Sequence, residues 1–187
     1  MRIIGGDLRG KMILPPNGYK ARPTTDFAKE GLFNTLINEF DFEELEVLDL
    51  FSGTGSISYE FASRGVQKVI SVEMNPFHCN FIKRCVSDFK LKNMQVVHHN
   101  VFDFLEICKV KFDIIFADPP YDIDGLENIP TKVFNKELVK EGGYLILEHP
   151  DTYSFTEDPR FVKEKKYGNV HFSYFRADVF AQKNIKK

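Results

Sequence analysis

The chain has 187 residues, 43% of them hydrophobic and 28% charged, values typical of one globular domain with an ordinary core. No apolar stretch approaches the roughly 18 residues of a membrane span, and the first residues lack the apolar core of a signal peptide. Three cysteines without CxxC spacing argue against a metal site. We therefore expect free thiols, no bound metal and a cytoplasmic protein without membrane contact.

The net charge of −2 is unevenly distributed along the chain. Residues 1–25 carry +4 and residues 160–187 carry +6, which leaves −12 in the segment between them. Basic ends on an acidic body would bring phosphates to one face, although terminal lysines can also serve solubility alone. The candidate contacts with nucleic acid are Arg2, Arg9, Lys11 and Arg22.

The first 25 residues predict a small β-hairpin. The segments 3–4 and 11–14, apolar except for Lys11, flank a glycine-containing turn, and Pro15-Pro16 then interrupts regular structure. A helix is expected over 26–39, with Thr25 or Asp26 as its N-cap. We therefore divide the chain into an N-terminal extension (1–25) and a single domain (26–187).

From residue 46 onward, apolar strands alternate with helices. The pattern predicts strands at 47–51, 68–73, 95–99, 113–117 and 143–148, and a hairpin over 161–180. Helices are expected through residue 64, from Asn75-Pro76 onward, and near 131–141. Repeated strand–helix units favour an α/β fold, with a parallel sheet covered by helices on both faces and an antiparallel edge.

A loop of the kind that wraps a nucleoside cofactor follows the first predicted strand. Gly53 and Gly55 allow the backbone to approach a ligand closely at the carboxyl end of a strand. The GxG spacing alone does not exclude a dinucleotide fold. However, the carboxylate of Asp49 disfavours a pyrophosphate and suits the cationic amino-acid group of S-adenosylmethionine, so we predict this cofactor, with S-adenosylhomocysteine as product.

The ends of the next two predicted strands complete the cofactor site. Glu73 is placed to bind the ribose hydroxyls, unless it is only an exposed acid at a strand end. Residues 100–102 offer an amide and apolar surface for adenine, although Phe102 could equally serve packing. The predicted cofactor residues of these loops are Asp49, Phe51, Ser52, Gly53, Gly55, Glu73, Met74, Asn100, Val101 and Phe102.

Asp118-Pro119-Pro120-Tyr121 ends the apolar run 113–117 and forms the predicted catalytic ledge. Proline fixes φ and has no N–H, so the carbonyls there face outward. Asp118 and the Pro119 carbonyl can accept hydrogen bonds from one –NH₂ group, and Tyr121 can stack on a flat ring. With the upstream glycine loop, this ledge predicts methyl transfer to the exocyclic amine of a nucleobase.

The two motifs resemble those of class I amino methyltransferases. The segments Met1–Gly6, Arg9–Lys11, Arg22–Asp26 and Leu32–Asn34 are further similar to the RsmD-type bacterial enzymes, which make N2-methylguanine in small-subunit (16S) ribosomal RNA. The resemblance covers nearly the whole chain. It implies a Rossmann-like, mostly parallel seven-stranded sheet with an antiparallel last strand and an N-terminal hairpin extension. It also implies that Arg22 and Thr24 approach the cofactor, and that the substrate is ribosomal RNA within the small subunit.

Other functions stay open from the residues alone. A DNA methyltransferase acting on adenine N6 or cytosine N4 uses a similar ledge, and a protein glutamine methyltransferase is conceivable, although that group favours Asn at position 118. A non-catalytic nucleotide-binding module for ribosome assembly would keep the fold. A Rossmann oxidoreductase would share the glycine loop. The histidines are expected in surface or packing roles, and a monomer is the default expectation.

Overall fold

The protein is described by a computed structural model over residues 1–15 and 24–178. Its strands occur in the order β3-β2-β1-β4-β5-β7-β6 within a seven-stranded sheet. The described pairings are parallel except those made by β7, the last strand of the chain. The predicted mostly parallel sheet with an antiparallel last strand is thus confirmed. The chain forms two compact units, residues 1–101 and 102–187, so the predicted division at residue 25 stays a prediction.

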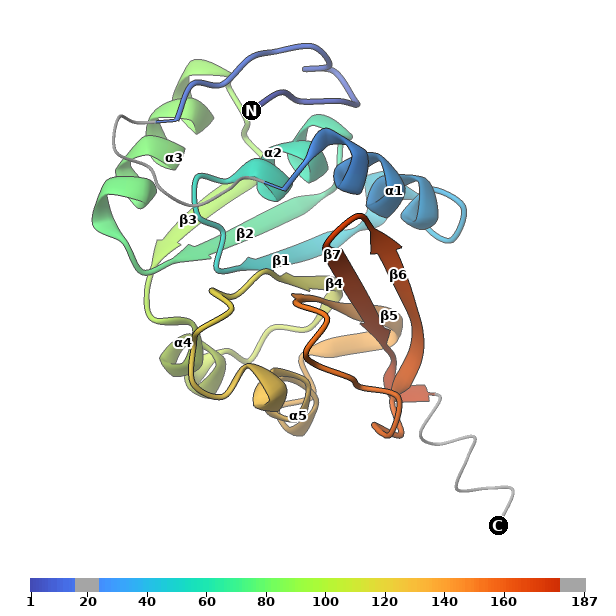
Figure 1. The fold of residues 1–187 in the computed structure, drawn as a ribbon. Coiled ribbons are helices and arrows are strands. Elements are labelled where there is room, and N and C mark those ends of the chain that lie inside the picture. Colours follow the sequence, from blue (N-terminus) through green and yellow to red (C-terminus); the bar gives the residue numbers. More distant parts are fainter. Residues whose placement is uncertain (16–23, 179–187) are drawn as a thin grey trace. The chain divides into compact units, whose positions relative to one another are not determined.

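The described residues of the first unit form three parallel strands and three α-helices (Figure 1). Thr25 caps the first helix by accepting a hydrogen bond from the Ala28 N–H, and Asn75 caps the third ahead of Pro76, as predicted. The elements are α1 (Asp26–Leu36), η1 (Phe42–Glu44), β1 (Glu46–Leu50), α2 (Ser56–Ser63), β2 (Lys68–Glu73), α3 (Pro76–Asp88) and β3 (Met94–His98).

Residues 1–13 form the predicted hairpin only in part. A single antiparallel bridge joins Arg2 to Met12, without a regular ladder. The segment is instead attached to α2, whose Ser63 carbonyl accepts from the Asp7 N–H at 2.8 Å and whose Ser63 hydroxyl donates to the Gly5 carbonyl at 2.6 Å. Backbone hydrogen bonds between Ile3 and Lys11 and between Met1 and Ile13 still join the two arms, and the hydrogen bonds to the helix add to this pairing.

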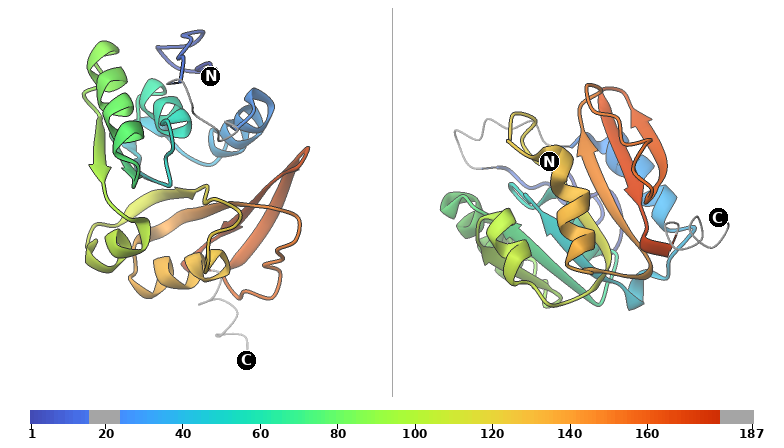
Figure 2. Two further views of the ribbon diagram at one scale, coloured as in Figure 1. Left: turned by 60° about the vertical axis from the view of Figure 1, so that its left-hand side comes forward. Right: turned by 90° about the horizontal axis from the view of Figure 1, so that it is seen from below.

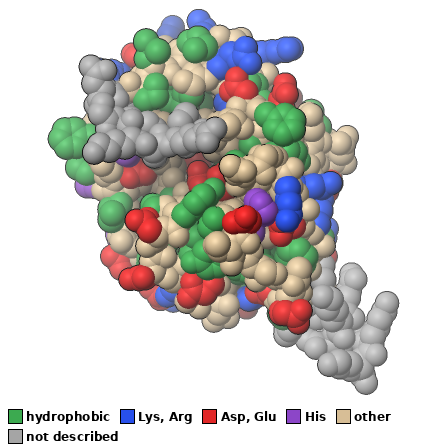
Figure 3. All heavy atoms as spheres, in the orientation of Figure 1, with side chains coloured by type: hydrophobic (Ala, Val, Ile, Leu, Met, Phe, Trp, Pro, Cys, Tyr) green, Lys and Arg blue, Asp and Glu red, His purple; other side chains and the backbone are tan. Residues whose placement is uncertain are grey.

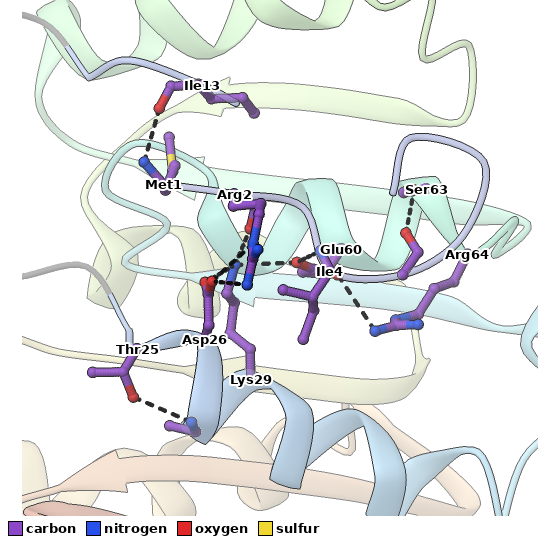
Figure 4. Close-up of polar contacts among 12 residues, drawn as sticks. Met1, Arg2, Ile4, Ile13, Thr25, Asp26, Lys29, Glu60, Ser63 and Arg64 are labelled. Carbon is purple, nitrogen blue, oxygen red and sulfur yellow. Dashed lines mark hydrogen bonds and ion pairs between the residues drawn. The ribbon is translucent and has the colours of Figure 1, made fainter. Parts of the chain in front are cut away.

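A buried ion pair holds the same segment against α1 and α2 (Figure 4). Lys29 is 1% exposed and Glu60 is fully buried, and their charged atoms lie 3.1 Å apart. Glu60 also accepts from the Ile4 N–H at 2.8 Å and pairs with Arg64 at 3.4 Å, while Lys29 donates to the Arg2 carbonyl. Paired cations compensate the burial of the Glu60 carboxylate.

In the second unit the described residues form four strands, with β4 parallel to β5 and β7 antiparallel to both β5 and β6. Figure 2 shows the long β6–β7 hairpin (red) beside β5. The core residues of β4 are continuously apolar from Ile114 to Ala117, as expected for a strand covered on both faces. The elements are α4 (Val101–Ile107), β4 (Phe112–Ala117), η2 (Leu126–Asn128), α5 (Ile129–Asn135), β5 (Val139–His149), β6 (Phe161–Tyr167) and β7 (Val170–Phe175).

Three predicted elements of the second unit were wrong in extent. The helix expected near 131–141 ends at Asn135, and β5 begins at Val139, before its Gly142-Gly143 pair. The helix α4 was not predicted. Strand β7 ends at Phe175 instead of 180, and positions 179–180 lie outside the described residues. No helix within the described ranges is both long and apolar enough to cross a bilayer.

Candidate active site

The glycine loop after β1 has a backbone conformation that few side chains adopt. Phe51, Gly53 and Gly55 have positive φ values of 58°, 55° and 86°, which cost residues with a Cβ about 1–2 kcal/mol. A Cβ on Gly55 would lie 2.9 Å from the Tyr59 ring, so this position requires glycine. Left-handed backbone at a non-glycine residue such as Phe51 is typical of ligand-binding loops.

The end of β2 holds this loop in place. The Ser52 N–H donates to the carbonyl of Val72 in β2 at 3.0 Å. Glu73 is 9% exposed; its Oε2 accepts from the Gly53 N–H at 2.8 Å and its Oε1 accepts from the Asn75 N–H at 2.7 Å. The carboxylate predicted to bind a ribose thus bridges the glycine loop and the start of α3, and each oxygen keeps a lone pair for another donor.

Asp49 is buried, with 1% of its surface exposed. Its carboxylate accepts a hydrogen bond from the Ser58 hydroxyl of α2, and its carbonyl accepts from the Ser52 hydroxyl at 2.7 Å. These contacts connect β1, the loop and α2. Direct contact between Asp49 and the cationic end of a cofactor stays a prediction.

The structure brings together two further predicted cofactor residues. Met74 follows β2 and is 61% exposed, and the Asn100 amide donates to its sulfur at 3.6 Å. Val101 is buried as the first residue of α4. Thr24 is half-buried, and Arg22 lies outside the described residues.

Phe102 belongs to the second unit. The ammonium of Lys132 lies 5.6 Å from the centre of its ring, within the range of a cation–π contact. This contact gives Phe102 a role in packing, and an adenine contact stays a prediction.

The predicted ledge follows β4 directly. Asp118 is half-buried, Pro119 is buried, Pro120 is exposed and Tyr121 is 44% exposed. The Ile123 N–H donates to the Pro120 carbonyl at 3.0 Å, which closes a turn behind the two prolines. Tyr121 is therefore partly exposed at the carboxyl end of the strand, and stacking of a base on its ring stays a prediction.

Glu148, which was not among the predicted site residues, also belongs to this ledge. The register pairs Ala117 with Leu147, so Asp118 and Glu148 follow at the same ends of neighbouring parallel strands. The Tyr121 hydroxyl donates to Glu148 Oε1 at 3.1 Å. Glu148 lies at the carboxyl end of the strand predicted next along the chain. This position could have marked it as a site residue, because the carboxyl ends of parallel strands meet at one edge of a sheet.

The two carboxyl groups perturb each other. Burial raises the pKa of Glu148 to about 7, against a smaller opposing effect of the hydrogen bond from Tyr121. Burial and then the charge of Glu148 raise the pKa of Asp118 well above its ordinary value. Burial and the same acids raise the pKa of the Tyr121 hydroxyl. Perturbed, adjacent titratable groups are characteristic of functional sites.

Basic side chains are exposed in both units. Arg2, Arg9 and Lys11 are exposed in the first. In the second, Figure 3 shows Lys and Arg side chains gathered over β6, which carries Lys165 and Lys166. Phosphate contacts by these residues stay predictions.

The buried histidines and the cysteines lie in surroundings that indicate packing roles. His149 and His171 are buried, and His149 Nε2 lies 2.8 Å from the Ser173 hydroxyl, as expected for packing histidines. All three cysteines are free thiols. Within the described residues, no cluster of three His, Cys, Asp or Glu side chains is suited to hold a metal ion.

A mostly parallel sheet ending in an antiparallel β7, with a left-handed glycine loop after β1 and an acid as the last residue of β2, defines the class I methyltransferase fold. Residues 1–176 match the family described as Conserved hypothetical protein 95. The chain belongs to this family, which comprises the RsmD-type methyltransferases.

Named relatives support the same assignment. The chain is 30% identical over 182 residues to ribosomal RNA small subunit methyltransferase D of Haemophilus influenzae, covering 94% of this chain and 93% of the relative. It is 27% identical over 179 residues to the protein of the same name from Buchnera aphidicola, covering 94% and 91%. The structure of the putative methyltransferase yhhF from Escherichia coli has a TM-score of 0.83 at 28% identity, covering 94% of this chain and 97% of that chain.

Proposed function

We propose that this protein transfers a methyl group from S-adenosylmethionine to the exocyclic N2 of a guanine in small-subunit (16S) ribosomal RNA. The observation that carries the proposal is the Asp118–Tyr121 ledge at the end of β4, held by Glu148, in a chain of the RsmD-type family. An acid, an outward carbonyl and an aromatic ring form a site for a planar amine.

The residues of the first unit fit the methyl donor. Gly53 and Gly55 have left-handed backbone, and this loop conformation would bring backbone N–H groups close to a ligand. Glu73 would hold the ribose hydroxyls with its remaining lone pairs, and Met74 and Asn100 would contact the adenine. S-adenosylmethionine, when bound, supplies a strongly electrophilic methyl group.

The residues of the second unit would prepare the acceptor nitrogen. The lone pair of an exocyclic amine is delocalised into the base, so the nitrogen is a poor nucleophile. Hydrogen bonds from the amine to Asp118 and to the Pro119 carbonyl favour a pyramidal nitrogen with a directed lone pair. Stacking on Tyr121 would contribute about 1–3 kcal/mol to base binding. Positioning, not strong base catalysis, is the main contribution of these residues.

Ribosomal RNA is the substrate that the relatives suggest. The named relatives from Haemophilus and Buchnera are small-subunit ribosomal RNA methyltransferases. The 16S rRNA N2 methyltransferase RsmC from Thermus thermophilus, solved in complex with AdoMet and guanosine, shares the fold with a TM-score of 0.65 at 20% identity. Exposed Arg9, Lys11 and Lys165 would contact phosphates, and we propose the small ribosomal subunit as the form in which the RNA is bound.

The test is a labelling experiment with small subunits from a strain that lacks the gene. The purified protein is incubated with these subunits and methyl-labelled S-adenosylmethionine, and the RNA is digested to nucleosides identified by mass. We expect labelled N2-methylguanosine with the wild-type protein and none with Asp118→Ala. Asp122→Ala, which removes an exposed acid four residues further on, is the matched control and should keep activity.

The outcome also separates the alternatives. Label in adenine or cytosine of added DNA, or in protein, would move the substrate to another class. Cofactor binding without any labelled product would favour a non-catalytic assembly module. Equal labelling by wild type and Asp118→Ala would remove Asp118 from the mechanism.

A further inference from the structure

Glu148 is a buried acid without a compensating cation. It is 5% exposed, and within the described residues it forms no ion pair with Lys, Arg or His. Its Oε1 accepts from the Tyr121 hydroxyl at 3.1 Å. Its Oε2 is buried and has no hydrogen-bond partner among the described residues.

This arrangement is costly for the fold alone. Burying an unpaired carboxylate costs several kcal/mol, and buried acids are therefore normally paired. Glu60 in the first unit shows the usual solution, with Lys29 at 3.1 Å and Arg64 at 3.4 Å. Glu148 instead adjoins a second acid, Asp118, whose pKa its charge raises. An unsatisfied acceptor next to the catalytic acid points to a ligand that brings its own donors.

Guanine brings such donors. Its Watson–Crick edge presents the N2 amino group directly beside the N1–H, so two neighbouring acceptors can each receive a hydrogen bond. Adenine and cytosine present their exocyclic amine beside a ring nitrogen that is itself an acceptor. Above its pKa of about 7, the ionised Glu148 beside Asp118 would face that lone pair and repel it.

We propose that Glu148 is the specificity-determining residue of the acceptor site, its Oε2 accepting from guanine N1–H while Asp118 accepts from the N2 amino group. The assignment rests on the proposed function, since it concerns the base at that same ledge. The hydrogen bond from Tyr121 orients the Glu148 carboxylate for this contact. Donation from the base to both acids offsets their mutual repulsion, so the site is satisfied only when guanine is bound.

The test replaces the base and keeps the amine. Small subunits are reconstituted with semisynthetic RNA that carries guanine or 2-aminopurine at the position labelled in the experiment above. 2-Aminopurine has the same exocyclic amine but an acceptor at N1. At about pH 8, above the pKa of about 7 of Glu148, we expect wild-type methylation to be roughly 10- to 100-fold slower on 2-aminopurine, the effect of one hydrogen bond to a charged group.

Two variants distinguish recognition from support of the fold. Glu148→Gln, whose amide can donate to N1, should slow guanine methylation and bring the guanine-to-2-aminopurine ratio close to one. Tyr121→Phe removes the hydrogen bond and keeps the carboxylate; it should slow both substrates and leave a preference for guanine. Thermal unfolding of both variants confirms that they are folded.

The results separate failure of this assignment from failure of the proposed function. No methylation of guanine by the wild-type protein would overturn the function. Methylation of guanine with the same ratio in wild type and Glu148→Gln would overturn only the role of Glu148, leaving it as a support for Tyr121.

Discussion

The attachment of the N-terminal segment to α2 depends on one glycine, Gly6. Its φ is +71°, and a Cβ placed on it would lie 1.8 Å from the Ser63 carbonyl oxygen, a backbone atom within α2. Gly10 is the matched control, because its φ is +87° and a Cβ there would meet nothing within 4 Å. Gly6→Ala and Gly10→Ala therefore share the backbone strain and differ in the clash.

The expected free energies of unfolding follow from these contacts. Either alanine in a left-handed conformation costs about 1–2 kcal/mol. Gly6→Ala must also separate the segment from Ser63. That loses the hydrogen bonds from the Asp7 N–H at 2.8 Å, from the Leu8 N–H at 2.9 Å, and from the Ser63 hydroxyl to the Gly5 carbonyl at 2.6 Å. At about 1 kcal/mol each, these bonds make Gly6→Ala about 3 kcal/mol more destabilising than Gly10→Ala.

Urea unfolding of the two variants measures this difference, and hydrogen exchange at Asp7 and Leu8 locates it. Protection of these two amides should fall in Gly6→Ala and persist in Gly10→Ala. Equal destabilisation by the two alanines, with protection retained in both, would refute the view that Ser63 holds the segment.

Two further predictions concern the carboxylates of the sites. Glu73→Ala should weaken S-adenosylhomocysteine binding by roughly 1.5–3 kcal/mol, the value for hydrogen bonds to a charged group. Calorimetry measures it against the exposed-acid control Glu43→Ala, and an unchanged affinity would contradict the ribose assignment. Glu148 has its pKa raised from an ordinary 4.5 to about 7, so between these values the folded protein holds a proton that the unfolded chain has lost. The contribution of this proton to the free energy of unfolding is complete below about pH 4.5 and is lost as the pH rises through about 7. The free energy of unfolding then falls by up to about 1.4 kcal/mol per pH unit. Urea midpoints from pH 5 to 8 should show this decline in wild type and less of it in Glu148→Gln; parallel profiles would mean that Glu148 is not the titrating group.

The parts of the fold that were predictable from sequence are those with strong local signals. Strand β2 has the predicted bounds Lys68–Glu73, and β4 differs by one residue, because both are short segments rich in apolar and β-branched residues. Thr25 and Asn75 cap their helices through contacts with residues three or fewer positions away. Such contacts need no knowledge of the rest of the chain.

The errors in the second unit have a tertiary cause. Gly142-Gly143 looks like a break before a strand, yet β5 runs through it. A Cβ on Gly143 would lie 2.4 Å from the Asp113 carbonyl oxygen of β4, and the register between these strands shifts there. Glycine thus permits a close approach of two backbones within a strand. The neighbour that requires it lies 30 residues upstream, so the local pattern could not show it.

Glu60 and Glu148 show why the candidate site was only partly predictable. Both are glutamates in apolar segments, and both are buried in the structure. Lys29 and Arg64 neutralise Glu60, which makes it part of the fold's support, whereas Glu148 adjoins the acid Asp118 and forms no ion pair with a cation among the described residues. Sequence identifies motifs such as Asp118–Tyr121 because their chemistry is contiguous. The function of Glu148 follows from the charges that surround it, and those come from other segments of the chain.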